Sequence, residues 1–183
     1  RRLGEWKLPN PLDGIRPFKE KEKEMSWLTD GQIKTLLEAC DTFGNVNLTR
    51  IVKICLATGS RWREAENLTR SQLSPYKITF IKTKGGKNRT VPIPRWLYDE
   101  LSPLKDRMFQ PCYKAFSEMI NIANIQLADG QNTHVLRHTF ASHFMMNGGN
   151  ILVLQRILGH ANIRETMRYA HFAPDHLEEA AQL

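Results

Sequence analysis

Apolar positions recur at helical spacing along most of the chain. The recurrence is clearest where four residues follow one another at i, i+3, i+4 and i+7, the pattern of a helix with one buried face: Ile33, Leu36, Leu37 and Cys40. A second apolar run covers residues 48–57 and predicts another helix. Gly59 can end that helix and let the next one begin near Arg61. We therefore expect Arg61 at a junction between two helices.

The periodicity changes once, from helical spacing to alternation. Alternating residues around Ile78 and Phe80, and again around Val91 and Ile93, flank the glycine pair 85–86 and predict a short β-hairpin. Helical spacing then returns and predicts helices at about 95–102, 112–126, 133–147, 150–158 and 162–170, with a short last helix opened by Pro174. The sequence thus predicts a mainly α-helical fold with a small antiparallel β-sheet or hairpin.

The length and composition predict one compact domain. With 183 residues and 41% hydrophobic residues, the chain can bury one sizeable core. Residues 1–25 hold three prolines and a dense run of charges, which predicts an extended interdomain linker and a chain that is a piece of a longer protein. We expect the compact domain at 26–172 and a C-terminal tail helix at 173–183.

Charge and cysteine content narrow the possible partners. The net charge of +7 favours a polyanionic partner, although many basic proteins never bind nucleic acid. Three widely spaced cysteines argue against a disulfide framework or a zinc knuckle, and predict buried thiols in a cytoplasmic protein. No apolar run approaches the roughly 18 residues of a membrane span, so no membrane partner is expected.

The helix expected at 133–147 has two distinct faces. One face collects apolar side chains and a different face collects His134, Arg137 and His138. Taken alone, this polar group is better explained by solvated surface residues than by a functional site. His134 and His138 also have the i, i+4 spacing of two zinc ligands. Because Val135 stands where a metalloprotease helix has glutamate, and the Arg137 cation would repel a metal, no metal site is expected.

Four further pieces, in chain order, change this interpretation. They are Arg61 in TGSRWRE, Lys84 at the hairpin, His160 in LGH and Tyr169 in TMRYAHF. Together with the His-x-x-Arg motif at 134–137, this ordered set resembles the tyrosine recombinase, or phage integrase, family over about residues 26–172. The resemblance is strongest to integrases of temperate bacteriophages, and implies the tyrosine recombinase catalytic-domain fold of DNA breaking-rejoining enzymes.

The resemblance implies a catalytic set and a role for each member. The set is Tyr169 as nucleophile with Arg61, Lys84, His134, Arg137 and His160. Guanidinium groups can bind the non-bridging phosphate oxygens, and Tyr169 would form a 3′-phosphotyrosine while Lys84 protonates the leaving 5′-oxygen. Which histidine acts as base stays open. A structural role, in which Tyr169 simply packs in the core, also stays open.

Supporting and DNA-contact residues complete the expected site. Glu64 would orient Arg61 or a histidine, unless it is an ordinary surface carboxylate, and His138 would support the active face. Residues expected to contact flanking phosphates are Arg63, Lys82, Lys87, Arg89, Arg95 and Arg164. The implied partners are double-stranded DNA at an attachment-site core, a homotetramer on DNA and accessory DNA-bending or excision proteins, with no cofactor.

The implied function is a site-specific recombinase that integrates and excises a phage genome in the cytoplasm of a bacterial host. Two alternatives differ in chemistry. A DNA-binding architectural or regulatory module that does not cut would need the arginines and not Tyr169. A type IB topoisomerase-like enzyme would share the phosphotyrosine but relax supercoils. The LGH context and the small size favour the recombinase.

Overall fold

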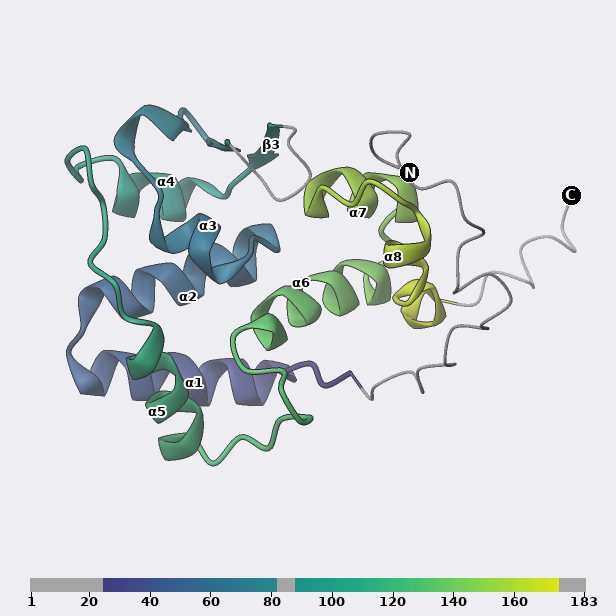
Figure 1. Ribbon diagram of the computed structural model, residues 1–183, viewed down its shortest axis with the longest axis horizontal. Coiled ribbons are helices and arrows are strands. Elements are labelled where there is room, and N and C mark those ends of the chain that lie inside the picture. Colours follow the sequence, from purple (N-terminus) through teal and green to yellow (C-terminus); the bar gives the residue numbers. More distant parts are fainter. Residues whose placement is uncertain (1–24, 82–87, 175–183) are drawn as a thin grey trace, which may run out of the picture.

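The computed structural model describes residues 25–81 and 88–174. The helices within these residues are α1 (Asp30–Phe43), α2 (Val46–Thr58), α3 (Trp62–Glu66), η1 (Arg70–Gln72), α4 (Arg95–Leu101), α5 (Tyr113–Ile122), α6 (His134–Met146), α7 (Ile151–Leu158), α8 (Arg164–Met167) and η2 (Ala170–Phe172). The strands are β1 (Leu73–Ser74), β2 (Lys77–Phe80) and β3 (Arg89–Pro92). Figure 1 shows the arrangement, which confirms the mainly helical fold with a small antiparallel sheet.

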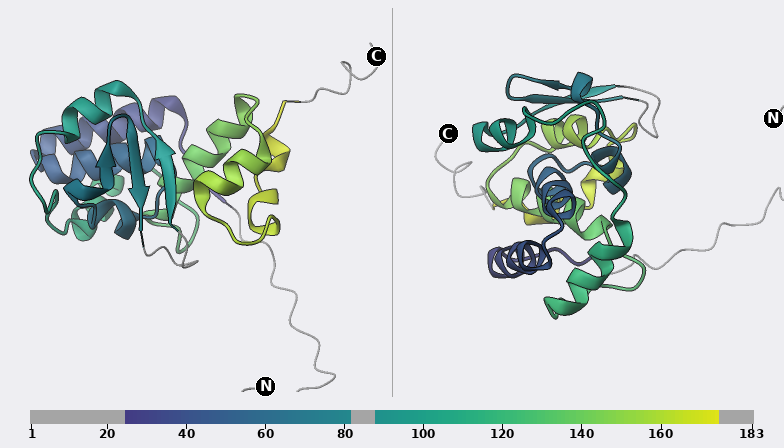
Figure 2. Two further views of the ribbon diagram at one scale, coloured as in Figure 1. Left: turned by 90° about the horizontal axis from the view of Figure 1, so that it is seen from above. Right: turned by 90° about the vertical axis from the view of Figure 1, so that its left-hand side faces the viewer.

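The three strands form one antiparallel sheet in the order β1-β2-β3. It lies at the edge of the domain opposite α1, as the two views in Figure 2 show. β2 and β3 pair with Ile78 opposite Val91, as the hairpin predicts. β1 was not predicted, because a two-residue strand is too short to produce an alternating pattern. The segment between β2 and β3 lies outside the described residues, and it contains Lys82, Lys84 and Lys87.

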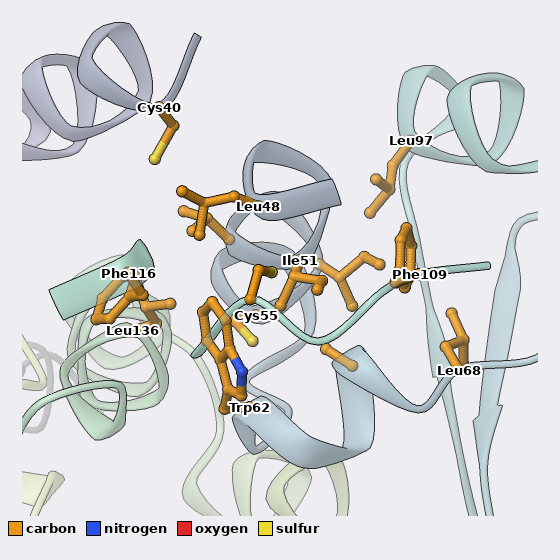
Figure 3. Packing of buried hydrophobic residues seen from close by; sticks show 14 of the residues in the cluster. Cys40, Leu48, Ile51, Cys55, Trp62, Leu68, Leu97, Phe109, Phe116 and Leu136 are labelled. Carbon is orange, nitrogen blue, oxygen red and sulfur yellow. The ribbon is translucent and has the colours of Figure 1, made fainter. Parts of the chain in front are cut away.

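The main core surrounds α2, which packs against α1, α3 and α6. Figure 3 shows Ile51 and Cys55 in the middle of this core, with Leu136 on one side and Phe109 on the other. All three cysteines are buried, as expected from the sequence. Burial raises the pKa of Cys55 to about 12 and the pKa values of Cys40 and Cys112 to about 11. The thiols are therefore protonated packing groups at neutral pH.

Gly59 fixes how the end of α2 meets the C-terminal helices. It ends α2 with a φ of 62°, in the left-handed region that favours glycine. A Cβ atom at this position would lie 2.5 Å from Cδ1 of Phe140 and 2.8 Å from Cδ2 of Leu158. The close approach brings the α2–α3 junction against α6 and α7, so that Arg61 caps α3 beside them. The expected helix junction at Arg61 is confirmed.

A second hydrophobic cluster joins the C-terminal half of α6 to the segments after it. Its buried members are Ala141, Met145, Leu154, Leu158 and Tyr169. The single helix expected at 162–170 is wrong: α8 ends at Met167 and η2 begins at Ala170, with Tyr169 in the turn between them. The backbone N–H of Tyr169 donates to the carbonyl of Thr166, and both side chains are buried. This hydrogen bond spans three residues, so the backbone tightens into 3-10 geometry here, which apolar spacing does not predict.

No helix in the described ranges is long and apolar enough to cross a membrane. The last helix expected from Pro174, and nearly all of the tail at 173–183, lie outside the described residues.

Candidate active site

One cavity of about 510 Å³ gathers the expected active-site residues that the structure describes. The cavity lies where the start of α3, the first half of α6, the α7–α8 connection and the turn after α8 converge. Its lining residues are Arg61, His134, Arg137, His138, His160, Arg164, Glu165, Arg168 and Tyr169. The lining contains four arginines and one carboxylate, so its net positive charge favours an anionic ligand.

Arg137 is fixed in place by carbonyl oxygens. Its side chain is 5% exposed, and its guanidinium donates to the carbonyl of Gly59 at 2.7 Å and to that of Leu158 at 2.8 Å. Burial, followed by the charges of Arg61 and Arg89, lowers the pKa of Arg137 to about 10. The group stays cationic at neutral pH, and it is positioned before any ligand arrives.

Arg61 is held by Glu64. The Glu64 carboxylate accepts from the backbone N–H of Arg61 at 2.9 Å and from its guanidinium at 3.3 Å. Burial alone would raise the pKa of Glu64, but hydrogen bonds and charge from Arg89, with those from Arg61, hold it below its ordinary value. Glu64 is therefore an ionised carboxylate that contacts Arg61, the first of the two partners considered from the sequence.

Arg89 was expected to contact DNA, and the structure places it elsewhere. It is 8% exposed, and its guanidinium binds Glu64 at 2.6 Å and 3.0 Å. Its Nε donates to the carbonyl of Ile157 at 2.7 Å, and the group lies over the ring of Phe80. These contacts leave no free face for a phosphate. The strand alternation could have shown this, because Arg89 lies on the same side of β3 as the buried Val91.

His160 is bound at both ring nitrogens. Nε2 lies 2.9 Å from a guanidinium nitrogen of Arg137, and Nδ1 lies 2.8 Å from the hydroxyl of Thr166. Because a guanidinium only donates, Nε2 accepts and Nδ1 carries the proton. Burial, followed by the charge of Arg137, lowers the pKa of His160 to about 4, so the ring is neutral at neutral pH. No sequence pattern pointed to Thr166, whose contact with His160 depends on how the chain turns between α7 and α8.

The structure places Tyr169 both in the core and at the cavity. Tyr169 is 1% exposed and belongs to the second hydrophobic cluster, yet it also lines the cavity. Its hydroxyl oxygen lies 2.7 Å from Nδ1 of His138. Burial raises the pKa of Tyr169, although Arg137 and Arg168 act in the opposite direction. The sequence placed His138 near the active face but not on this hydroxyl.

The remaining expected residues lie at the rim or outside the described chain. His134 is exposed at the first residue of α6, with its ring centre 6.4 Å from that of His138. Arg63, Arg95 and Arg164 are exposed, and Arg164 lines the cavity. Arg168 also lines it and was missed, although it directly precedes Tyr169. Lys84 cannot be placed, because it lies outside the described residues.

The part of the chain that the structure describes contains no candidate metal site. Residues 25–81 and 88–174 contain no group of three His, Cys, Asp or Glu side chains that could hold a metal ion. The cations that face the cavity are those of its arginines.

A helical domain with this small sheet, and with arginines, histidines and a tyrosine around one cavity, has the catalytic-domain fold of the tyrosine recombinases. The chain belongs to the phage integrase family, whose sequence model matches residues 26–176. The catalytic domain of bacteriophage HP1 integrase is 58% identical, with a TM-score of 0.83 over 87% of this chain and 95% of that chain. The resemblance stated from the sequence is confirmed.

The chain matches only part of its longer relatives. The integrase of Escherichia phage 186 is 61% identical over 183 residues, which cover 54% of its length, and that of Escherichia phage P2 is 42% identical over 51% of its length. The chain thus spans about half the length of these curated relatives. The XerH site-specific recombinase, solved bound to its difH substrate after cleavage, is 26% identical, with a TM-score of 0.63 over 86% of this chain and 53% of that chain.

Proposed function

We propose that this chain is the catalytic part of a site-specific DNA recombinase that cleaves and rejoins DNA to integrate and excise a phage genome. The observation that carries the proposal is the shared cavity: the hydroxyl-bearing Tyr169 and the fixed guanidinium of Arg137 line it together with Arg61. A nucleophile beside two permanent cations suits attack on a phosphodiester, whose non-bridging oxygens gain charge in the transition state.

The proposed reaction needs no external source of energy. The Tyr169 hydroxyl gives its proton to a histidine of the cavity as its oxygen bonds to phosphorus, the bond from phosphorus to the 5′-oxygen breaks, and Lys84 gives that oxygen a proton. A 5′-hydroxyl from another strand then attacks the phosphotyrosine, its proton passes to Lys84, and the released Tyr169 oxygen takes a proton back. The phosphodiester energy is kept in the covalent intermediate, so neither water nor a nucleotide cofactor is consumed.

Each basic group has a part in this proposal. Arg61 and Arg137 bind the non-bridging oxygens, His134 adds a hydrogen bond to them, and His160 holds Arg137 in place. Arg63, Arg95 and Arg164 contact flanking phosphates, a role supported by their exposure. Lys82 and Lys87 share that role, and they lie outside the described residues. Arg89 is left out, because its guanidinium is buried against Glu64.

The assembly is also part of the proposal. A homotetramer on double-stranded attachment-site DNA would bring two duplexes together in the cytoplasm of a bacterial host, with accessory DNA-bending or excision proteins. The tail at 173–183 would pack on a neighbouring subunit, and residues 1–25 would connect to a preceding domain. The length of the relatives supports further sequence beyond this chain, since the chain covers only about half of them.

A nicked suicide substrate tests the chemistry. The full-length protein is incubated with a nicked duplex that carries its attachment core, and the products are run on a denaturing gel. We expect a covalent adduct with the wild type and none with Tyr169→Phe. An adduct that survives in Tyr169→Phe contradicts the proposal, and DNA binding without any adduct favours the non-cutting module. Relaxation of supercoiled DNA lacking the core favours the topoisomerase.

A further inference from the structure

We propose that His138 is a catalytic residue, which takes the phenol proton of Tyr169 through Nδ1 as the tyrosine attacks phosphorus. This inference rests on the proposed function. The sequence left open which histidine acts as base, with His134 and His160 as the aligned candidates. The geometry points instead to the third histidine of the cavity.

The contact between the two side chains is direct. Nδ1 of His138 and the hydroxyl oxygen of Tyr169 are 2.7 Å apart, which is hydrogen-bond distance. His138 lies in the middle of α6, and α6 packs against η2, the segment that follows Tyr169. The tyrosine is 1% exposed within the second hydrophobic cluster. Both partners are thus held by packing, and the hydroxyl has little freedom to turn elsewhere.

The two histidines that match the family motif, His134 and His160, lie in positions that suit other roles. Both ring nitrogens of His160 are engaged, one with the Arg137 guanidinium and one with the Thr166 hydroxyl. His134 is exposed at the first residue of α6, one helical turn before His138. His134 is therefore placed to contact a phosphate oxygen that approaches from solvent. The only ring N–H of neutral His160 is already donated to Thr166, and His160 instead holds Arg137.

The surroundings of His138 keep its ring neutral at neutral pH, which leaves one ring nitrogen able to accept, and they also make the ring a weaker base than a free imidazole. Burial lowers its pKa to about 4, and Arg168, His134, Arg137 and His160 act in the same direction. A neutral imidazole that bonds the phenol through the Nδ1 lone pair carries its own proton on Nε2. An imidazolium formed among these cations is strongly acidic. Because His138 lines the cavity, it can pass the proton on to solvent.

The step is balanced at every atom. An electron pair of the phenol oxygen forms the bond to phosphorus, and the O–H bond of Tyr169 breaks as its proton moves to Nδ1 of His138. The bond from phosphorus to the 5′-oxygen breaks, and that oxygen takes the proton of the general acid assigned to Lys84. In the rejoining step the attacking 5′-hydroxyl gives its proton to the now neutral Lys84, and His138 returns a proton to the departing tyrosine.

The test compares two leaving groups in single-turnover cleavage of the suicide substrate. One substrate has the ordinary 5′-oxygen, and the other has a bridging sulfur, which departs without a proton. The variant His138→Asn keeps a polar atom near the place of Nδ1 but cannot take a proton. We expect it to lose about 10²-fold or more in cleavage rate on both substrates. Lys84→Ala should lose rate on the oxygen substrate and recover it on the sulfur substrate.

Controls separate this proposal from the function on which it rests. His171 is exposed, two residues beyond Tyr169, and does not line the cavity, so His171→Asn should cleave at the wild-type rate. DNA binding and thermal melting are measured for each variant, and His138→Gln replaces His138→Asn if the latter melts below the assay temperature. Absence of an adduct with the wild type defeats the proposed function itself.

Two outcomes with an active wild type overturn the role of His138. A cleavage rate within about threefold of the wild type shows that no proton transfer to this residue matters. Recovery of the variant on the sulfur substrate places His138 on the leaving-group side and not on the nucleophile.

Discussion

At the scale of single residues, Gly59 determines whether the site can assemble. Its left-handed φ and the atoms of Phe140 and Leu158 next to it leave no room for a Cβ. We expect Gly59→Ala to lower the free energy of unfolding by about 2–4 kcal/mol, because strain and overpacking add. Gly44 also has a positive φ but has nothing within 4 Å of its Cβ position, so Gly44→Ala should cost only about 1 kcal/mol. Urea unfolding of both variants measures the difference, and equal losses would show that packing at Gly59 is unimportant.

The sequence predicted most of the site at this scale because the family motif is an ordered string of residue types. Arg61, Arg137 and Tyr169 could be named from that order, and they line one cavity. The partners of these residues could not be named. The contact from His138 to Tyr169 joins positions 31 residues apart across a turn that the helical pattern missed. Such contacts depend on tertiary packing, which local periodicity does not encode.

At the scale of elements, Arg89 connects three of them. Through Glu64 it joins β3 to α3, and through the carbonyl of Ile157 it joins both to α7. The Glu64 side chain is only 11% exposed, so Arg89→Met would leave a buried carboxylate without its closest partner. We expect a loss of about 3–5 kcal/mol in unfolding free energy, with partial recovery in Arg89→Met/Glu64→Gln. Urea unfolding of the single and double variants tests this, and a double variant no more stable than the single one would contradict it.

Prediction from the sequence failed at two places, Arg89 and the helix expected at 162–170. Arg89 was assigned to DNA from its charge, although its place in the strand alternation put it on the buried side. The helix expected at 162–170 is divided where the backbone changes from α to 3-10 geometry between Met167 and Ala170, which apolar spacing does not encode. Arg89 was thus misassigned against a correct strand pattern, whereas the divided helix departs from the local helical pattern.

At the scale of the whole molecule, stability should depend on pH through two histidines. The pKa values of His138 and His160 are lowered from 6.5 to about 4, chiefly by burial. Between these values the unfolded chain binds protons that the folded chain refuses, so stability present above about pH 6.5 is lost as the pH falls toward 4. We expect the unfolding free energy to decrease from pH 7 to pH 5, and to decrease less in His138→Asn/His160→Asn. An unchanged pH dependence in the double variant would contradict this assignment.

The proposed chemistry also predicts behaviour of the whole protein without divalent ions. Because the arginines of the cavity supply the positive charge that divalent ions supply in two-metal nucleases, adduct formation should continue in EDTA. The suicide-substrate assay with and without chelator measures this. Loss of the adduct on chelation, restored by magnesium, would contradict the mechanism.

The most direct way to test whether Tyr169 is the nucleophile is to map the bond between protein and DNA. The covalent adduct is digested with protease and nuclease, and the modified peptide is sequenced by mass spectrometry. If Tyr169 is the nucleophile, a nucleotide is attached to it through the 3′-phosphate, in the peptide that contains TMRYAHF. Attachment to Tyr76, Tyr98 or Tyr113, or to a residue other than tyrosine, would contradict it.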